Sequence, residues 1–263
     1  MPRIRDVGDF LEELAPSRLA EDWDNVGLLV GDPQREVKRI MTCLTITPAS
    51  AEEAVRQRAD LIISHHPLPF RPLKRLTTAS TPGRLLLQLI TAHVAVYSPH
   101  TALDSASCGI NQRLAESLGM VEIKPLVARQ DDPGGLGAGR CGRLPEARPL
   151  QVVADRVKRF LSLGSVQAVG AADQTVERIA VACGAAGAFL ASAIETECDL
   201  FVTGETSFHA LLEAEARNIT LLLLGHYASE RFAIESLAQI LAAHFRDVDV
   251  WSSRAETDPL HRL

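Results

Sequence analysis

The sequence has little that is typical of a disulfide-rich, membrane-spanning or secreted protein. Its 5 cysteines include no Cys-x-x-Cys pair, which argues against a zinc knuckle or a thioredoxin-type motif and favours a reducing compartment. No apolar run reaches the length of a membrane span, and residues 1–6 lack the apolar core of a signal peptide. We therefore expect a cytoplasmic protein without a membrane partner.

Long basic runs are also missing. The formal net charge is -6, which argues against a nucleic-acid partner. The nearest basic cluster, Arg156–Arg159, fits the polar face of a helix. An apolar content of 46% and a charged content of 23% are typical of a globular protein, and 263 residues allow one large domain or two smaller ones.

Two parts of the sequence follow one plan of strand and helix. Arg39–Cys43 leads, 21 positions on, to Asp60–His66, and Arg178–Ala182 leads, again 21 positions on, to Asp199–Glu205. A strand followed by a helix, repeated, predicts parallel strand pairing with right-handed crossovers. We expect an α/β fold in which helices flank mainly parallel sheets.

The two copies indicate two similar lobes. No low-complexity tract or long linker separates them, so we expect residues 1–125 and residues 126–263 to pack together. One run between the copies, Gly137–Gly142, matches the dinucleotide-binding fingerprint letter for letter. That fingerprint requires a helix starting at its glycines, whereas Pro145 and Pro149 follow here, so we predict a strand and a turn.

His65 and His66 follow the apolar strand Leu61–Ile63 and therefore lie at its carboxyl end, where open α/β sheets bind ligands. Neighbouring side chains of an extended segment point in opposite directions, so the two rings could face two metal ions. The alternative is a pair of loop histidines without a ligand.

Two further pairs place a histidine four residues before a carboxylate. His100 and Asp104 follow one predicted strand, and His226 and Glu230 follow another. Residues at positions i and i+4 share one helix face, so each pair could bind one metal ion; alone, each could equally be a surface ion pair. Mixed imidazole and carboxylate groups suit zinc, manganese, iron, cobalt or nickel rather than calcium. Without a nearby thiolate, an open catalytic site is expected rather than a structural zinc.

Some remaining polar residues have two interpretations. Glu205 and His209 are predicted to share a helix face and could orient a ligand or move a proton; alternatively, they mark a helix start capped by Thr206 or Ser207. Trp23–Asn25 either lines a pocket or forms a polar turn anchored by its tryptophan. Three histidines have no partner at a suggestive spacing and are expected to be structural or at the surface: His93, His244 and His261.

Taken together, these residues resemble the GTP cyclohydrolase 1 type 2 homologues, also called NIF-three-like proteins, a family with a dinuclear metal centre. The matching stretches cover nearly the whole chain and keep the family's order. They are Trp23–Gly27, Ser64–Leu68, Tyr97 with His100–Asp104, Thr203–Glu205 with His209, and Gly225–Glu230.

The resemblance implies a site with two divalent metal ions in the cleft between the lobes. Its ligands would be His65, His66, Asp104, His226 and Glu230, with Glu230 as the bridging carboxylate. His100 would be a sixth ligand or a substrate contact. One departure is visible: Thr45 stands where the family commonly has Asp. The resemblance also implies a homo-oligomer in the form of a ring-shaped hexamer.

The expected function is metal-dependent hydrolysis of a nucleotide-like or phosphorylated small molecule. Metal ions lower the pKa of a bound water and neutralise phosphate charge, and His100 or His209 could pass the proton. The family label makes GTP a candidate, although the sequence shows no purine-specific pocket. The alternative is a non-enzymatic metal-binding regulator or scaffold, which the resemblance also implies.

Overall fold

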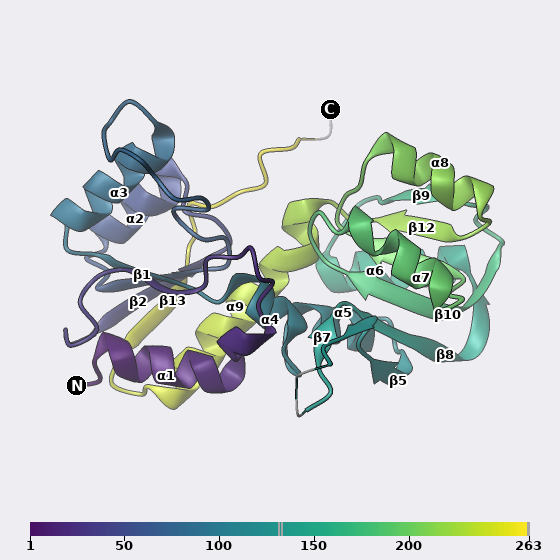
Figure 1. Cartoon of the computed structure of the whole chain (residues 1–263), viewed down its shortest axis with the longest axis horizontal. Helices are drawn as coiled ribbons and strands as arrows, with labels where there is room; N and C mark the ends of the chain where they lie inside the picture. Colours follow the sequence, from purple (N-terminus) through teal and green to yellow (C-terminus); the bar gives the residue numbers. More distant parts are fainter. Residues whose placement is uncertain (131, 133, 262–263) are drawn as a thin grey trace. The chain divides into compact units, whose positions relative to one another are not determined.

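The chain folds into two units, each with its own sheet and core. The computed structural model describes residues 1–130, 132 and 134–261, and Figure 1 gives the order of the elements. Unit 1 comprises Met1–Leu103 and Ala233–Leu263, and unit 2 comprises Asp104–Phe232.

The unit boundaries fall inside two helices, α4 (His100–Ser105) and α9 (His226–His244). They therefore differ from the lobes drawn from the sequence, 1–125 and 126–263. The reason is that α9 carries the chain back to unit 1, where the last strand, β13 (Asp249–Ser252), pairs with β2 (Arg39–Cys43).

Unit 1 is built on a five-stranded sheet in the order β1-β4-β3-β2-β13. The strands from β4 to β13 pair in parallel, and β1 pairs antiparallel with β4. Besides β2, β13 and α9, its elements are α1 (Ile4–Leu14), η1 (Ser17–Leu19), β1 (Gly27–Val30), α2 (Pro48–Arg56), β3 (Leu61–Ser64), α3 (Thr81–Thr91) and β4 (Ala95–Ser98).

Helices cover both faces of the unit 1 sheet (Figure 1). On one face, α2 and α3 pack onto a core that includes Met41, Ile62 and Val96. On the other face, the Thr42 hydroxyl donates a hydrogen bond to the carbonyl of Ile234 in α9 (3.1 Å). A strand buried on both faces reads as a continuous apolar run, which explains why the sequence identified β2 and β3 so readily.

Unit 2 is built on a six-stranded sheet in the order β5-β8-β10-β11-β12-β9. Only its centre, from β10 to β12, is parallel; β8, β5 and β9 join antiparallel. Its elements after α4 are α5 (Ile110–Ser117), β5 (Val121–Lys124), β6 (Val127–Ala128), β7 (Gly137–Ala138), β8 (Arg140–Pro149), α6 (Leu150–Leu161), β9 (Gln167–Val169), β10 (Thr175–Ala182), η2 (Gly187–Phe189), α7 (Leu190–Glu195), β11 (Leu200–Thr203), α8 (Phe208–Ala216) and β12 (Thr220–Leu223).

The central strands of unit 2 send alternate side chains into two separate cores. Along β10, Ile179 and Val181 enter the core shared with α5 and α6, whereas Ala180 and Ala182 enter the core shared with α7 and α8. This alternation follows from the two-residue period of a strand. The predicted α/β class, with helices flanking mainly parallel sheets, is therefore confirmed for the centre of each sheet, and the edges add antiparallel strands.

The predicted repeat also has a structural basis. In unit 1, the Asp60 carboxylate accepts the backbone N–H groups of Lys38 (2.8 Å) and Arg39 (3.0 Å) at the start of β2. In unit 2, the Asp199 carboxylate accepts those of Glu177 (2.9 Å) and Arg178 (2.8 Å) within β10. Each aspartate thus aligns the first strand of its copy with the next, which sets the common carboxyl edge where functional groups gather.

The sequence predicted neither a dinucleotide-binding helix at Gly137–Gly142 nor a membrane-spanning helix. The Gly137–Gly142 run forms β7 and the first residues of β8 rather than a helix, as predicted. Across residues 1–130, 132 and 134–261, no helix has the length and apolar character that a membrane span requires.

Candidate metal centre

Unit 1 brings three histidines together at the carboxyl ends of β3 and β4. One potential ligand nitrogen from each of His65, His66 and His100 lies within 4.8 Å of the others. The rings of His65 and His66 are 5.1 Å apart between centroids, so they do not point in opposite directions as expected. The chain bends at both residues after β3 ends at Ser64, so the alternation of an extended strand no longer applies.

A buried aspartate fixes the ring of His100. Asp24 Oδ1 lies 2.7 Å from His100 Nδ1, and Oδ2 accepts the Thr101 backbone N–H at 3.1 Å. Burial alone would raise the pKa of Asp24, but the hydrogen bonds from His100 and Thr101 outweigh it and lower that pKa to about 2. An ionised Asp24 accepts a hydrogen bond from the Nδ1–H group, which leaves Nε2 as the nitrogen of His100 that could bind a metal ion. Of the two interpretations of Trp23–Asn25, the one that places it at the site is therefore supported for Asp24.

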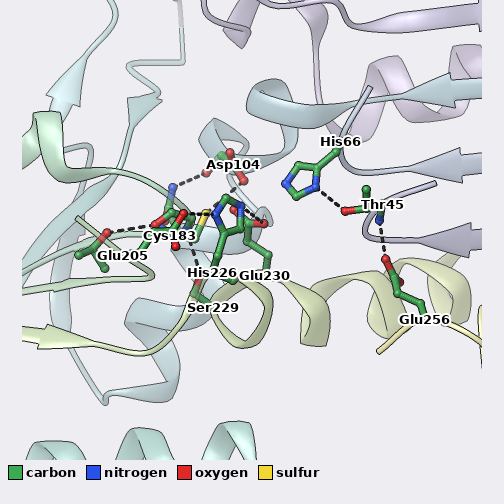
Figure 2. Close-up of polar contacts among 12 residues, drawn as sticks. Thr45, His66, Asp104, Cys183, Glu205, His226, Ser229, Glu230 and Glu256 are labelled. Atoms are coloured by element: carbon green, nitrogen blue, oxygen red, sulfur yellow. Dashed lines mark hydrogen bonds and ion pairs between the residues drawn. The ribbon is translucent and has the colours of Figure 1, made fainter. Parts of the chain in front are cut away.

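His66 is oriented by Thr45, the position at which the sequence departs from the family pattern. The Thr45 hydroxyl lies 2.7 Å from His66 Nδ1 (Figure 2). Thr45 is itself held by Glu256, a buried carboxylate that also accepts the Leu44 backbone N–H at 2.8 Å. Threonine here supplies a neutral oxygen to the histidine.

In unit 2, Asp104 is held by Cys183, which is 79 positions away, and by Asn111, which is 7 positions away. The Cys183 thiol donates to Asp104 Oδ1 (3.2 Å), and Asn111 Nδ2 donates to the Asp104 carbonyl (3.2 Å). Asn111 Oδ1 in turn accepts the Cys183 N–H (2.7 Å), which closes a ring of hydrogen bonds. Burial, followed by the charges of Asp104 and Glu230, raises the pKa of Cys183 well above its usual value, so the thiol stays protonated and remains a donor.

The sequence missed both supporting residues of Asp104. Cys183 is one of five cysteines without a Cys-x-x-Cys spacing, and Asn111 belongs to no recognisable motif. The one usable signal was position, because Cys183 directly follows β10 and so lies at the carboxyl edge of the sheet.

His226 and Glu230 do meet across one turn of α9. Glu230 Oε2 lies 3.2 Å from His226 Nε2, and Glu205 Oε1 lies 2.9 Å from His226 Nδ1 (Figure 2). Glu230 is 3% exposed. Gly184 adjoins the pair with a φ of +65°, and a Cβ at this position would collide with Glu230 Oε1. Position 184 therefore requires glycine, because any side chain there would occupy the space of the buried Glu230 carboxylate.

Glu205 and His209 do not share a helix face, because α8 begins only at Phe208. Ser207 caps that helix by accepting the Ala210 N–H at 3.3 Å, as one of the two interpretations expected. Glu205 instead contacts His226, which supports its role in orienting a ligand. His209 is exposed on α8 with its ring 6.3 Å from that of Phe208. Among the other histidines, His244 stacks on Phe10 at 4.0 Å and is structural, as expected.

Three histidines of the candidate site are oriented in the same way, through a contact at Nδ1. In His66, His100 and His226, Nδ1 faces an oxygen of another side chain: Thr45, Asp24 and Glu205 respectively. Fixing Nδ1 in this way sets the ring orientation and leaves Nε2 as the nitrogen that could bind a metal ion, a pattern typical of metal-ligating histidines. Together with the room that Gly184 leaves beside Glu230, these donor groups fit a divalent cation.

His226 should hold its proton far above neutral pH in protein treated with EDTA. The hydrogen bond and charge of Glu230, together with Glu205, raise the pKa of His226 to about 9 from its ordinary 6.5. Because the folded-state pKa is raised, the stabilisation from the charged ring is complete below pH 6.5 and is lost as the pH rises through about 9. We expect the NMR titration of the His226 ring to have its midpoint near 9, and Glu230→Gln to lower it. A midpoint near 6.5 would contradict the geometry.

Comparisons with known proteins give one consistent family. A model of the Duf34/NIF3 (NGG1p interacting factor 3) family matches residues 2–259. NIF3-like protein 1 of Drosophila melanogaster is 37% identical over 254 residues, which cover 95% of this chain and 86% of the relative. A GTP cyclohydrolase 1 type 2 homolog of Clostridium acetobutylicum is 32% identical over 228 residues, which cover 87% of this chain and 85% of the relative. The crystal structure of a Staphylococcus aureus hypothetical protein, 28% identical, superposes over 100% of both chains with a TM-score of 0.89.

Proposed function

Since this chain belongs to the Duf34/NIF3 family, as the resemblance predicted, we propose that it is a metal-dependent hydrolase of a nucleotide-like or other phosphorylated small molecule. The proposed ligands of two divalent metal ions are His65, His66, Asp104, His226 and Glu230. The observation that carries the proposal is that the strand ends of each unit gather oriented groups of metal-ligand type. The name of the Clostridium acetobutylicum relative makes GTP one candidate substrate.

The donor set suits zinc, manganese, iron, cobalt or nickel, because it combines imidazole nitrogens with carboxylate oxygens. When bound, such an ion lowers the pKa of a water ligand and supplies hydroxide near neutral pH. The chain's own residues would orient the ligands and handle the proton. Thr45, Glu205 and Cys183 orient His66, His226 and Asp104 through the contacts described above.

Two histidines are proposed to carry the proton during the reaction. His100 has Nδ1 held by Asp24, so its Nε2 can accept a proton from a substrate or water and return it to the leaving group. His209 is exposed on α8 and could act only through a substrate or water that reaches this helix. His100 is therefore the preferred candidate.

The second candidate is a metal-binding regulator without catalytic activity. The family description, NGG1p interacting factor 3, refers to a protein partner of a relative and favours this alternative. The same ligands would then hold metal that stabilises a binding surface. The formal net charge of -6 on the chain argues for a protein partner rather than a nucleic acid.

Metal content and turnover separate these two functions. Protein purified without chelators or a polyhistidine tag is analysed for metals, and a panel of nucleotides and phosphoesters is tested with added manganese or zinc. We expect His65→Asn to lose bound metal and to lower turnover by about 100-fold or more. His93→Asn is the matched control, because His93 is exposed with a φ of +57°, which asparagine tolerates.

Bound metal without turnover of any compound in the panel would favour the regulator. Loss of metal in both variants, or in neither, would contradict the proposed ligands. We also propose, by resemblance, a cytoplasmic ring-shaped hexamer, for which light scattering should give six times the chain mass of 28.5 kDa.

A further inference from the structure

Two exposed aromatic side chains flank His100 in unit 1. Trp23 is 62% exposed and Phe70 is 49% exposed. Their ring centroids lie 5.9 Å apart, and each lies 6.0 Å from the ring of His100. An isolated exposed apolar residue needs no explanation, but two large rings in contact beside a cluster of oriented histidines indicate a binding surface.

The backbone that carries these rings is held firmly. Asn25 Nδ2 donates to the Pro69 carbonyl at 2.9 Å, which ties the loop of Trp23 to the loop of Phe70. The Glu21 N–H donates to the Thr101 hydroxyl at 3.0 Å, and Asp24 is bound to His100. These hydrogen bonds hold the backbone of both loops next to His100, so little backbone ordering is required when a ligand binds.

We propose that Trp23 and Phe70 form an aromatic platform that stacks the planar heteroaromatic ring of the substrate beside His100. A flat ring gains offset stacking on such side chains, and its polar edge can then face the histidines. The proposal rests on the proposed function only in treating the ligand as the substrate. It narrows the proposed substrates to compounds that carry a planar ring, and it names the residues that select them.

The size of the platform favours a small molecule over a protein partner. A buried aromatic side chain contributes about 150–250 Å², so two half-exposed rings offer roughly 200 Å². A stable protein interface needs about 800 Å² from each partner. The platform is therefore large enough for one ring system and too small for a protein interface by itself.

The chain offers a direct reporter for this proposal, since it contains only 2 tryptophans. The substitution Trp251→Phe removes the other one, which packs against Arg39 at 5.1 Å, and leaves Trp23 as the sole tryptophan. Guanosine monophosphate is titrated into this variant, and tryptophan fluorescence is followed. We expect saturable quenching, whereas ribose 5-phosphate, which lacks the ring but retains the phosphate, should cause none.

Substitutions of the two rings, with a control in unit 2, test the platform itself. Phe70→Leu should weaken binding of guanosine monophosphate by about tenfold, because base stacking on one aromatic side chain typically contributes on that order. Phe160→Leu removes an aromatic ring of similar exposure (43%) in unit 2 and should leave binding unchanged. Calorimetry on Trp23→Phe and Trp23→Leu completes the series; only the leucine variant should lose affinity by about tenfold or more.

Equal quenching by ribose 5-phosphate would overturn the proposal, because the exposed cations after Phe70 (Arg71, Lys74 and Arg75) would then explain binding. Equal effects of Phe70→Leu and Phe160→Leu, or no saturable quenching at all, would overturn it as well. Metal content is measured on the same samples. Bound metal and turnover without ring binding would refute only the platform, whereas ring binding without turnover would refute only the hydrolase.

Discussion

Replacing Glu230 with glutamine is expected to lower the affinity for divalent metal by at least about 100-fold, because even residues that only support a ligand change metal affinity by about 10- to 100-fold. Glu230 is 3% exposed, lies 3.2 Å from His226 and has glycine beside it at position 184. Glutamine keeps this shape but removes the negative charge. The measurement is the dissociation constant for zinc or manganese, obtained by competition with a chromogenic chelator.

The matched control is Glu235→Gln on the same helix. Glu235 is exposed, so its substitution changes the net charge equally and should leave the dissociation constant within about twofold, as expected for a screened surface charge. If both variants bind metal as the parent protein does, Glu230 is not a ligand. If both weaken binding equally, the effect reflects overall charge, and the proposed site is also contradicted.

The parts of this fold that the sequence predicted are those with a local cause. Buried strands such as β2 and β10 appear as continuous apolar runs, and the Asp60 and Asp199 anchors recur at the same spacing. The spacing of His226 and Glu230 guarantees that they meet once a helix forms there. Local periodicity is sufficient in each case.

The parts that the sequence could not predict depend on contacts between distant segments. Asp24 meets His100 across 76 positions, and Cys183 meets Asp104 across 79. No periodicity links such pairs, because only the tertiary fold brings these distant segments together. The pairing of β13 with β2 is similar: only the direction of α9 decides which sheet receives the last strand.

Strand β8 contains a proline, although prolines usually interrupt a strand inside a sheet. The sequence predicted a strand and a turn around Gly137–Gly142, before Pro145 and Pro149, yet β8 continues as a strand to Pro149. Its register against β10 shifts between Val176 and Arg178, opposite the segment that contains Pro145. A proline is tolerated there because the irregular pairing does not require its missing N–H.

Replacing Arg140 with methionine is expected to lower the free energy of unfolding by about 3–5 kcal/mol, as for other groups that leave buried polar partners unmatched. Arg140 is 1% exposed. Its guanidinium donates five hydrogen bonds of 2.7–2.9 Å to uncharged acceptors, namely Gln112 Oε1 and the carbonyls of Ser105, Ala106, Gly137 and Gly139. Burial lowers the pKa of Arg140, but a guanidinium remains charged in proteins.

Lysine should not rescue this site, because one ammonium group cannot replace five donors spread over a planar fork. We therefore expect urea unfolding of Arg140→Lys to resemble that of Arg140→Met. Arg143→Met is the control: the Arg143 side chain is 43% exposed and pairs with Glu122 at the surface, so its loss should leave the free energy of unfolding nearly unchanged. Because Arg140 holds the two carbonyls that directly follow Asp104, its substitution should also weaken metal binding, whereas Arg143→Met should not. Unfolding of Arg140→Met and Arg143→Met at the same urea concentration would refute this account of the buried charge.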